Sequence, residues 1–402
     1  MKKISAKEAF FLKNEHFDLK PPKRYLSDLI IQKAPIINKT RKSIDSKTRK
    51  KKFLCALIDI SFENNNTKLE DKMLEFESCF HDILDKKKTF SIILDKTLIV
   101  LLFWGYENEV QAFHLLSLFK NSLSEKFDAK VRIGASHYPY HNFLKSKIFD
   151  NAIKAFDHAG FFGLDALVYF DANSLNISGD RYYELELYEM ATKEYKKGIE
   201  IEPDNTNLIN SLGVCYAINN KLGKAKNEFE KAMKRSKTDL IVIYNLSLVY
   251  IFHKDIDTAI KLLKNAHKKS DKFFEIELLL GRLLFKKGRF KNAFLFLENA
   301  SKLNSGSSIA FKLKGEVFLK QKNAYKAKHE FDSAIKINPY DAVSLSGYAR
   351  ALEMQDKNLK IALSFAKHSL ILEPDNELFK QRIERIQKKI DNTSSEKNIK
   401  TG

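Results

Sequence analysis

A repeat of 34 residues runs through the second half of the chain and constrains its fold more than any other feature. Small residues recur at this spacing at Gly179, Gly213, Ser247, Gly281, Gly315 and Ala349. An alanine stands twelve residues after each of the first five positions, and an aromatic residue or leucine stands sixteen residues after. This pattern is typical of paired helices that pack through small residues and stack into a solenoid, because one pair cannot bury its own apolar face.

The repeat predicts six helix–turn–helix units over residues 172–376. Residues 377–391 are predicted to form a polar-faced capping helix, and residues 392–402 a disordered tail. The ladder of small residues and alanines resembles the tetratricopeptide repeat family. The resemblance implies an all-α superhelical solenoid that binds a protein or peptide in its concave groove.

In that family the first helix of each repeat lines the groove, which implies a set of candidate binding residues. These lie three residues before and one residue after the small-residue positions, with two phenylalanines close by: Asn210, Val214, Tyr244, Leu248, Phe252, Leu278, Arg282, Phe285, Lys312 and Glu316. Apolar and aromatic residues beside arginine are typical of binding hot spots. We therefore expect a partner with apolar anchors and acidic residues. The alternative is that these side chains pack against the preceding helix or a terminal arm.

The first 52 residues carry a large part of the formal charge of +19, with 16 basic and 5 acidic residues. Their weak apolar periodicity predicts a basic flexible arm that is dispensable for folding. Contact with nucleic acid or an anionic surface is an alternative function of this arm. The arm lacks the interleaved aromatic residues that stack on bases, so a solvated linker is favoured.

Residues 53–171 have a different pattern, in which short apolar runs alternate with amphipathic stretches. The runs at 53–60, 90–93, 98–103, 131–136 and 166–170 predict strands, and 69–83, 110–123 and 142–158 predict helices. The order β-α-β-β-α-β-α-β begins as a ferredoxin-like split unit. It predicts an α/β domain with an antiparallel sheet and helices on one face.

Three segments of this domain resemble the GGDEF-type nucleotide-cyclase family. They are FLCALIDISF at 53–62, VRIGA at 131–135 and NAIKAFDHAGFFGLDALVYFD at 151–171. The resemblance implies a cyclase-type sheet domain, with Asp59 at the position of a metal-binding carboxylate. Ser61 stands where the family has its second aspartate.

The family's signature hairpin is replaced by Leu94-Asp95-Lys96-Thr97-Leu98. This segment has no glycine pair to approach a triphosphate and no carboxylate pair to hold a second divalent ion. We therefore predict a degenerate, non-enzymatic domain with no cofactor and no metal, in which Asp59 is vestigial. The chain would be a scaffold or adaptor. The alternative is a signalling protein whose cyclase-like domain still binds a nucleotide or keeps residual diguanylate cyclase activity.

The three cysteines, Cys55, Cys79 and Cys215, form no Cys-x-x-Cys pair, and reduced, buried thiols are favoured over a disulfide or metal role. The longest apolar stretch runs from Leu98 to Tyr106, far short of the roughly 20 residues that a membrane helix needs. We expect a cytoplasmic protein without a membrane span.

Overall fold

The computed structural model describes residues 21–22, 24–48, 52–62, 72–81, 83 and 86–400, without the side chains of residues 73, 80 and 393–400. The chain divides into two compact units, Met1–Ser236 and Lys237–Gly402. This division falls inside the repeat array, whereas the sequence predicted a domain boundary after residue 171. Each unit is described by itself below.

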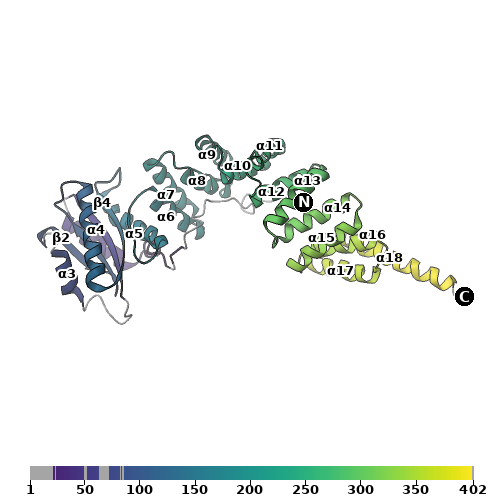
Figure 1. Cartoon of the computed structure of the whole chain (residues 1–402), viewed down its shortest axis with the longest axis horizontal. Coiled ribbons are helices and arrows are strands. Elements are labelled where there is room, and N and C mark those ends of the chain that lie inside the picture. Colours follow the sequence, from purple (N-terminus) through teal and green to yellow (C-terminus); the bar gives the residue numbers. More distant parts are fainter. Residues whose placement is uncertain are drawn as a thin grey trace. The chain divides into compact units, whose positions relative to one another are not determined.

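A five-stranded sheet forms the first part of the first unit (Figure 1). Its strands are β1 (Phe53–Ser61), β2 (Thr89–Ile93), β3 (Leu98–Phe103), β4 (Lys130–Tyr138) and β5 (Leu167–Tyr169), in the order β2-β3-β1-β4-β5. β1 pairs antiparallel with β3 and β4, and β3 pairs antiparallel with β2. β5 pairs parallel with β4, so the last strand departs from the antiparallel sheet that the sequence predicted.

Both faces of this sheet are covered by helices. Leu54, Ala56, Ile58 and Ile60 of β1 belong to the core that holds α3 (Met73–His81) and α4 (Glu109–Phe127). Phe53, Cys55 and Leu57 belong to the opposite core, with α2 (Pro35–Thr48) and α5 (Ile148–Ala159). The prediction of helices on one face is therefore wrong. The physical reason is that β1 is apolar at almost every position, as strands buried on both faces are.

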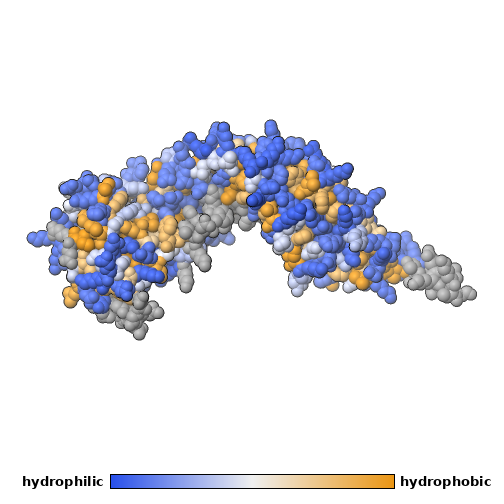
Figure 2. Space-filling model, in the orientation of Figure 1, coloured by the Kyte–Doolittle hydropathy of each residue, from blue (hydrophilic) through white to orange (hydrophobic). Residues whose placement is uncertain are grey.

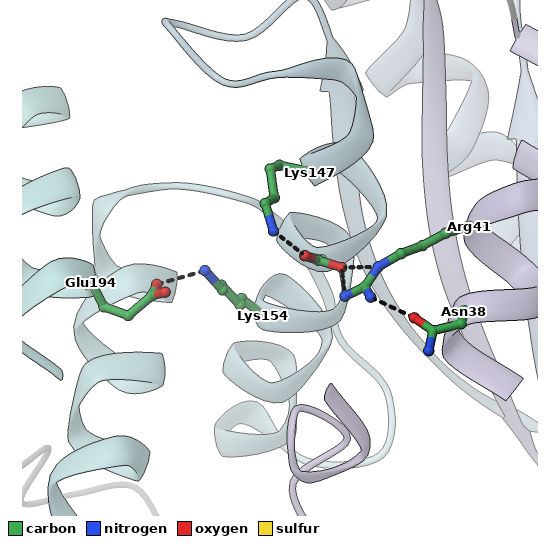
Figure 3. Close-up of polar contacts among 6 residues, drawn as sticks. Asn38, Arg41, Lys147, Lys154 and Glu194 are labelled. Carbon is green, nitrogen blue, oxygen red and sulfur yellow. Dashed lines mark hydrogen bonds and ion pairs between the residues drawn. The ribbon is translucent and has the colours of Figure 1, made fainter. Parts of the chain in front are cut away.

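The N-terminal segment packs on the sheet domain over its described part. It forms α1 (Asp28–Ile31) and α2, and Ile37 and Ile44 of α2 are 1% and 3% exposed. The Arg41 guanidinium donates to the Asp150 carboxylate at 2.6 and 2.9 Å, and Figure 3 shows Lys147 approaching from the other side. The predicted flexible arm is therefore wrong for residues 24–48. Residues 1–20 and 49–51 lie outside the described residues.

Four helices complete the first unit as two antiparallel pairs. They are α6 (Ala172–Glu184), α7 (Tyr188–Ile201), α8 (Thr206–Ile218) and α9 (Leu222–Arg235). An ion pair connects α5 of the sheet domain to α7, because Lys154 Nζ lies 2.6 Å from Glu194 Oε2 (Figure 3). The first repeat is thus attached to the sheet domain by contacts within one compact unit.

The second unit is entirely helical among the described residues. Its helices are α10 (Leu240–Phe252), α11 (Ile256–His267), α12 (Phe274–Lys286), α13 (Phe290–Leu303), α14 (Ser308–Lys320), α15 (Ala324–Ile337), α16 (Ala342–Met354), α17 (Leu359–Leu372) and α18 (Glu377–Lys400). The capping helix α18 continues to residue 400, so the disordered tail predicted from residue 392 is wrong up to that point. Residues 401–402 lie outside the described residues.

The small-residue ladder is confirmed as a packing device. A Cβ atom at Gly213 would lie 2.6 Å from Phe229, and one at Gly315 would lie 2.9 Å from Phe331. In both repeats the contact partner is the aromatic residue sixteen positions later, on the second helix of the same pair. The two helices approach this closely only because the glycine has no side chain.

Candidate functional site

The candidate groove residues of the first unit are not exposed. Asn210 and Val214 lie on α8, and each is 0% exposed. All residues of that helix from Leu208 to Ile218 are buried. Both side chains are therefore covered within the folded chain, and their role as groove residues stays a prediction.

The candidate residues of the second unit lie on α10, α12 and α14. Tyr244 and Leu248 on α10 are each only 8% exposed. The others are half-buried: Phe252, Leu278, Arg282, Phe285, Lys312 and Glu316. α12 contacts both α10 and α14, and α14 contacts α16. These first helices of successive repeats therefore form one layer, which we call the inner face of the second unit.

Charged groups from three repeats interact on this inner face. Lys312 Nζ on α14 lies 3.1 Å from Oδ1 of Asp341, the N-cap residue of α16. Burial raises the pKa of Glu316, Asp341 raises it further, and Lys312 and Arg282 act in the opposite direction. Glu316 therefore lies within electrostatic reach of cations on both its own helix and α12.

Arg282 also interacts with the aromatic part of the inner face. Burial, followed by the nearby Glu275 carboxylate, raises the pKa of Tyr244 to about 12, and Arg282 acts to lower it. The guanidinium thus acts electrostatically on a phenol of α10 and on a carboxylate of α14. A half-buried cation beside aromatic and aliphatic side chains can bind a carboxylate of a peptide while its neighbours contact apolar side chains.

Sequence reasoning missed two carboxylates of this face. Glu275 follows the N-cap residue of α12 by two positions, and Asp341 caps α16, where its side chain accepts a hydrogen bond from the Ser344 N–H at 3.2 Å. The sequence feature that could have revealed Asp341 is its position just before the first helix of the sixth predicted repeat, where aspartate is favoured as an N-cap residue. Its pairing with Lys312 depends on the stacking of two repeats.

The suspected metal residue Asp59 is already paired on both oxygens. Thr97 Oγ1 donates to Asp59 Oδ1 at 2.7 Å, and the Arg132 guanidinium donates to Oδ2 at 3.1 Å. Asp59 and Arg132 face each other directly across β1 and β4. A fixed guanidinium therefore supplies the positive charge that a divalent ion would bring. Among the described residues, no three His, Cys, Asp or Glu side chains are grouped so that they could hold a metal ion.

A cleft of about 320 Å³ lies beside this pair. Its lining includes Arg24, Asp59, Asp95, Thr97 and Arg132, together with apolar residues of α1, α2 and β3. The N-terminal segment thus contributes directly to the region where the cyclase-type resemblance would place a nucleotide.

Comparison with known proteins identifies one of the repeats. Residues 172–205 match the family model described as tetratricopeptide repeat. The matched residues span α6 and α7, so this first helix pair is identified as a tetratricopeptide repeat. The match does not extend to the sheet domain, and the cyclase-type resemblance of residues 53–171 remains a proposal.

Curated relatives resemble parts of the chain. A BBSome complex member BBS4 homolog of Drosophila melanogaster is 31% identical over 116 residues, which are 29% of this chain and 24% of the relative. A TPR repeat-containing protein of Methanocaldococcus jannaschii is 28% identical over 163 residues, 39% of this chain and 28% of the relative. The chain spans about a quarter of the length of each. Among solved structures, Pseudomonas aeruginosa PilF matches with 17% identity and a TM-score of 0.48, over 52% of this chain and 95% of that one.

Proposed function

We propose that this protein is a non-enzymatic scaffold or adaptor that binds a protein or peptide on the inner face of its second unit. The observation that carries the proposal is the convergence of half-buried charged groups from α12, α14 and α16 beside aromatic side chains of α10 and α12. The BBSome-named relatives, described as members of a complex, support an assembly role. The sheet domain would serve as a second interaction or sensory module.

The partner segment would carry apolar anchors and acidic residues. Arg282 and Lys312 supply two cations on this face, and the whole chain has a formal charge of +19. An acidic segment is therefore attracted at long range and pairs with Arg282 at short range. Phe285 and Leu278, both half-buried, supply apolar surface on the same helix as Arg282.

The experiment that tests this function is capture of partners from the native cell by the full chain. The test variant is Arg282→Glu combined with Lys312→Glu, and the control is Lys291→Glu combined with Lys336→Glu, which changes exposed lysines of the second helices α13 and α15. We expect the test variant to weaken binding of the captured partner by about 2 kcal/mol or more, since hot-spot losses reach this size. Equal binding by the test and control variants would show that the partner does not bind the inner face.

A second candidate function is nucleotide binding without turnover, or residual cyclase activity, in the sheet domain. The 320 Å³ cleft with two arginines beside Asp59 favours it. Calorimetry with GTP, with and without Mg²⁺, tests whether the sheet domain binds this nucleotide. Because Arg132 and Thr97 already occupy the carboxylate, we expect Asp59→Ala to leave any GTP affinity unchanged. Mg²⁺-dependent binding that disappears in this variant would contradict the degenerate domain.

We also propose a cytoplasmic location. Cys55, Cys79 and Cys215 are buried and form no disulfide, as is usual for cysteines of cytosolic proteins. Among the described helices, none has the length and apolar character needed to cross a bilayer.

A further inference from the structure

A cleft of about 830 Å³ runs along β5, the last strand of the sheet in the first unit. Every residue from Asp165 to Asp171 contributes to its lining, so the strand itself forms the floor. One wall comes from Glu109 and Phe113 at the start of α4. The other comes from His158 in the last turn of α5 and from Phe162, in the short 3-10 helix that follows it. The cleft therefore occupies the space between the two helical layers where one more strand would lie.

The backbone of β5 is paired on one side only within the described sheet. The Ile133 N–H donates to the Ala166 carbonyl, and the Phe170 N–H donates to the Ala135 carbonyl, each at 2.7 Å. Alternation along a parallel ladder then directs the backbone groups of Leu167 and Tyr169 away from β4 and into the cleft. A row of such groups is a template for pairing with another chain.

Aromatic side chains on both walls provide apolar contact surface. Phe113 stacks on Tyr169, with ring centroids 3.9 Å apart, and the Tyr169 hydroxyl donates to the Phe113 carbonyl at 3.0 Å. These contacts fix the wall on the α4 side. Phe162 on the other wall is 55% exposed and so is available to a ligand.

Three carboxylates, Glu109, Asp165 and Asp171, line the cleft together with two histidines, His137 and His158. The Glu109 side chain is 59% exposed, and its Oε2 lies 3.4 Å from His137 Nε2. Burial lowers the pKa of His137 although Glu109 opposes this, so burial disfavours the charged form of the imidazole. Asp165 is paired with Lys120 at 2.5 Å, and Asp171 Oδ1 lies 3.5 Å from His158 Nδ1, whereas the Glu109 side chain stays largely exposed.

We propose that this cleft binds an extended peptide segment of a partner protein, which adds a strand to β5, places apolar side chains on Phe113 and Phe162, and pairs a lysine or arginine with Glu109. Main-chain hydrogen bonds give affinity in such β-augmentation, and alternate side chains give specificity. The opposite edge, β2, is preceded by Lys86, Lys87 and Lys88, the type of residue that discourages strand addition. The β5 strand itself, Leu-Val-Tyr, has no lysine.

The test uses the full chain and a capped octapeptide of alternating valine and threonine with a central phenylalanine and a lysine at each end. A second peptide carries N-methyl groups on the amides that would face β5. Glu109→Lys is compared with Glu125→Lys, which makes the same charge change at an exposed position further along α4. Leu167→Pro removes one cleft-facing donor without removing a bond to β4.

We expect the unmodified peptide to bind and to slow amide hydrogen exchange at Leu167 and Tyr169. Glu109→Lys and Leu167→Pro should each weaken it about tenfold or more, and Glu125→Lys should not. The N-methylated peptide should fail to bind. The Arg282→Glu and Lys312→Glu variant should bind normally, so this site and the inner face are tested separately.

Several outcomes would overturn the proposal. These are no binding at millimolar peptide, equal binding of the N-methylated peptide, and an unchanged affinity in Glu109→Lys. If Leu167→Pro does not fold, the comparison of the unmodified with the N-methylated peptide and the Glu109→Lys variant still test the proposal. Concentration-dependent dimerisation that Leu167→Pro abolishes would assign the edge to a second copy of the chain instead.

Discussion

Single residues decide how closely the repeat helices approach. At Gly213 an added Cβ would meet the fully buried ring of Phe229, whereas at Gly223, on the next helix, it would meet nothing within 4 Å. The same substitution therefore has opposite consequences ten residues apart. Helix propensity favours alanine at both positions, and packing opposes it at only one.

We expect Gly213→Ala to destabilise the first unit by about 1–3 kcal/mol, because overpacking forces a buried ring to move. Gly223→Ala should stabilise it by about 0.5 kcal/mol through the entropy of the unfolded chain. Urea unfolding followed by the fluorescence of the single tryptophan, Trp104, measures both. Equal effects of the two substitutions would contradict the packing role of the ladder.

A buried lysine in the second unit was not predicted from the sequence. Lys314 is 5% exposed, and its Nζ lies 2.5 Å from Glu298 and 3.1 Å from Glu330. Burial opposes ionisation of Glu298, but Lys314 and, to a smaller extent, Lys302 outweigh it and lower the pKa of that carboxyl. The stabilisation is therefore present above the ordinary pKa of glutamate and is lost as the pH falls through the lowered pKa.

Replacing Lys314 by methionine should cost about 3 kcal/mol at pH 7, since it leaves carboxylates without their buried partner. The cost should shrink when the pH falls below about 4, as those carboxylates become protonated. Chemical unfolding followed by circular dichroism at several pH values checks this. Lys336→Met, at a side chain 75% exposed, is the control and should have little effect. A cost independent of pH would exclude the ionic explanation.

At the scale of elements, two carboxylates of α5 hold the N-terminal segment: Asp150 binds Arg41 of α2, and Asp157 binds the residues just before α1. The Asp157 carboxylate accepts hydrogen bonds from the backbone N–H groups of Leu26 and Ser27, at 2.6 and 3.0 Å. Burial nevertheless raises its pKa to about 6. The folded first unit therefore binds this proton more tightly than the unfolded chain does.

This shift gives a pH dependence with a definite sign. The contribution of Asp157 to stability is fully present below the ordinary pKa of aspartate, declines as the pH rises, and is lost above about 6. We expect Asp157→Asn to remove this decline, because the amide does not titrate. The free energy of unfolding at pH 4.5 and pH 7.5, reported by Trp104, tests it. The same decline in wild type and variant would place its origin in another group.

At the scale of the whole molecule, the chain consists of two compact units, each with its own buried residues. In the view of Figure 2, the surface of both is mainly hydrophilic, with hydrophobic patches over the sheet and the repeats. We do not expect such a chain to unfold in one step, because each unit with its own hydrophobic core unfolds as a separate cooperative structure.

We expect two unfolding transitions. Trp104 reports only the first unit, whereas circular dichroism reports both. Gly213→Ala should lower the midpoint of the transition that fluorescence reports. Lys314→Met should lower the midpoint of the transition that only circular dichroism reports. A single transition that coincides in both signals and moves with either variant would show that the array unfolds as one cooperative structure.

The sequence by itself determined the local and repetitive features of this protein. The 34-residue spacing predicted the helix pairs and their packing through small residues. The apolar runs predicted the strands. These features depend on neighbours within one element or one repeat, so periodicity is enough to reveal them.

Only the tertiary structure decided which distant residues meet. The register of β1 and β4 places Arg132 on Asp59, and the stacking of repeats buries Lys314 between two glutamates. α2 has a weak apolar pattern, yet the second face of the sheet needs a cover and α2 supplies part of it. The burial of Asn210 and Val214 likewise depends on the parts of the chain that pack around α8, which the 34-residue spacing does not reveal. Such contacts follow from how whole elements pack, and packing is a property of the folded chain.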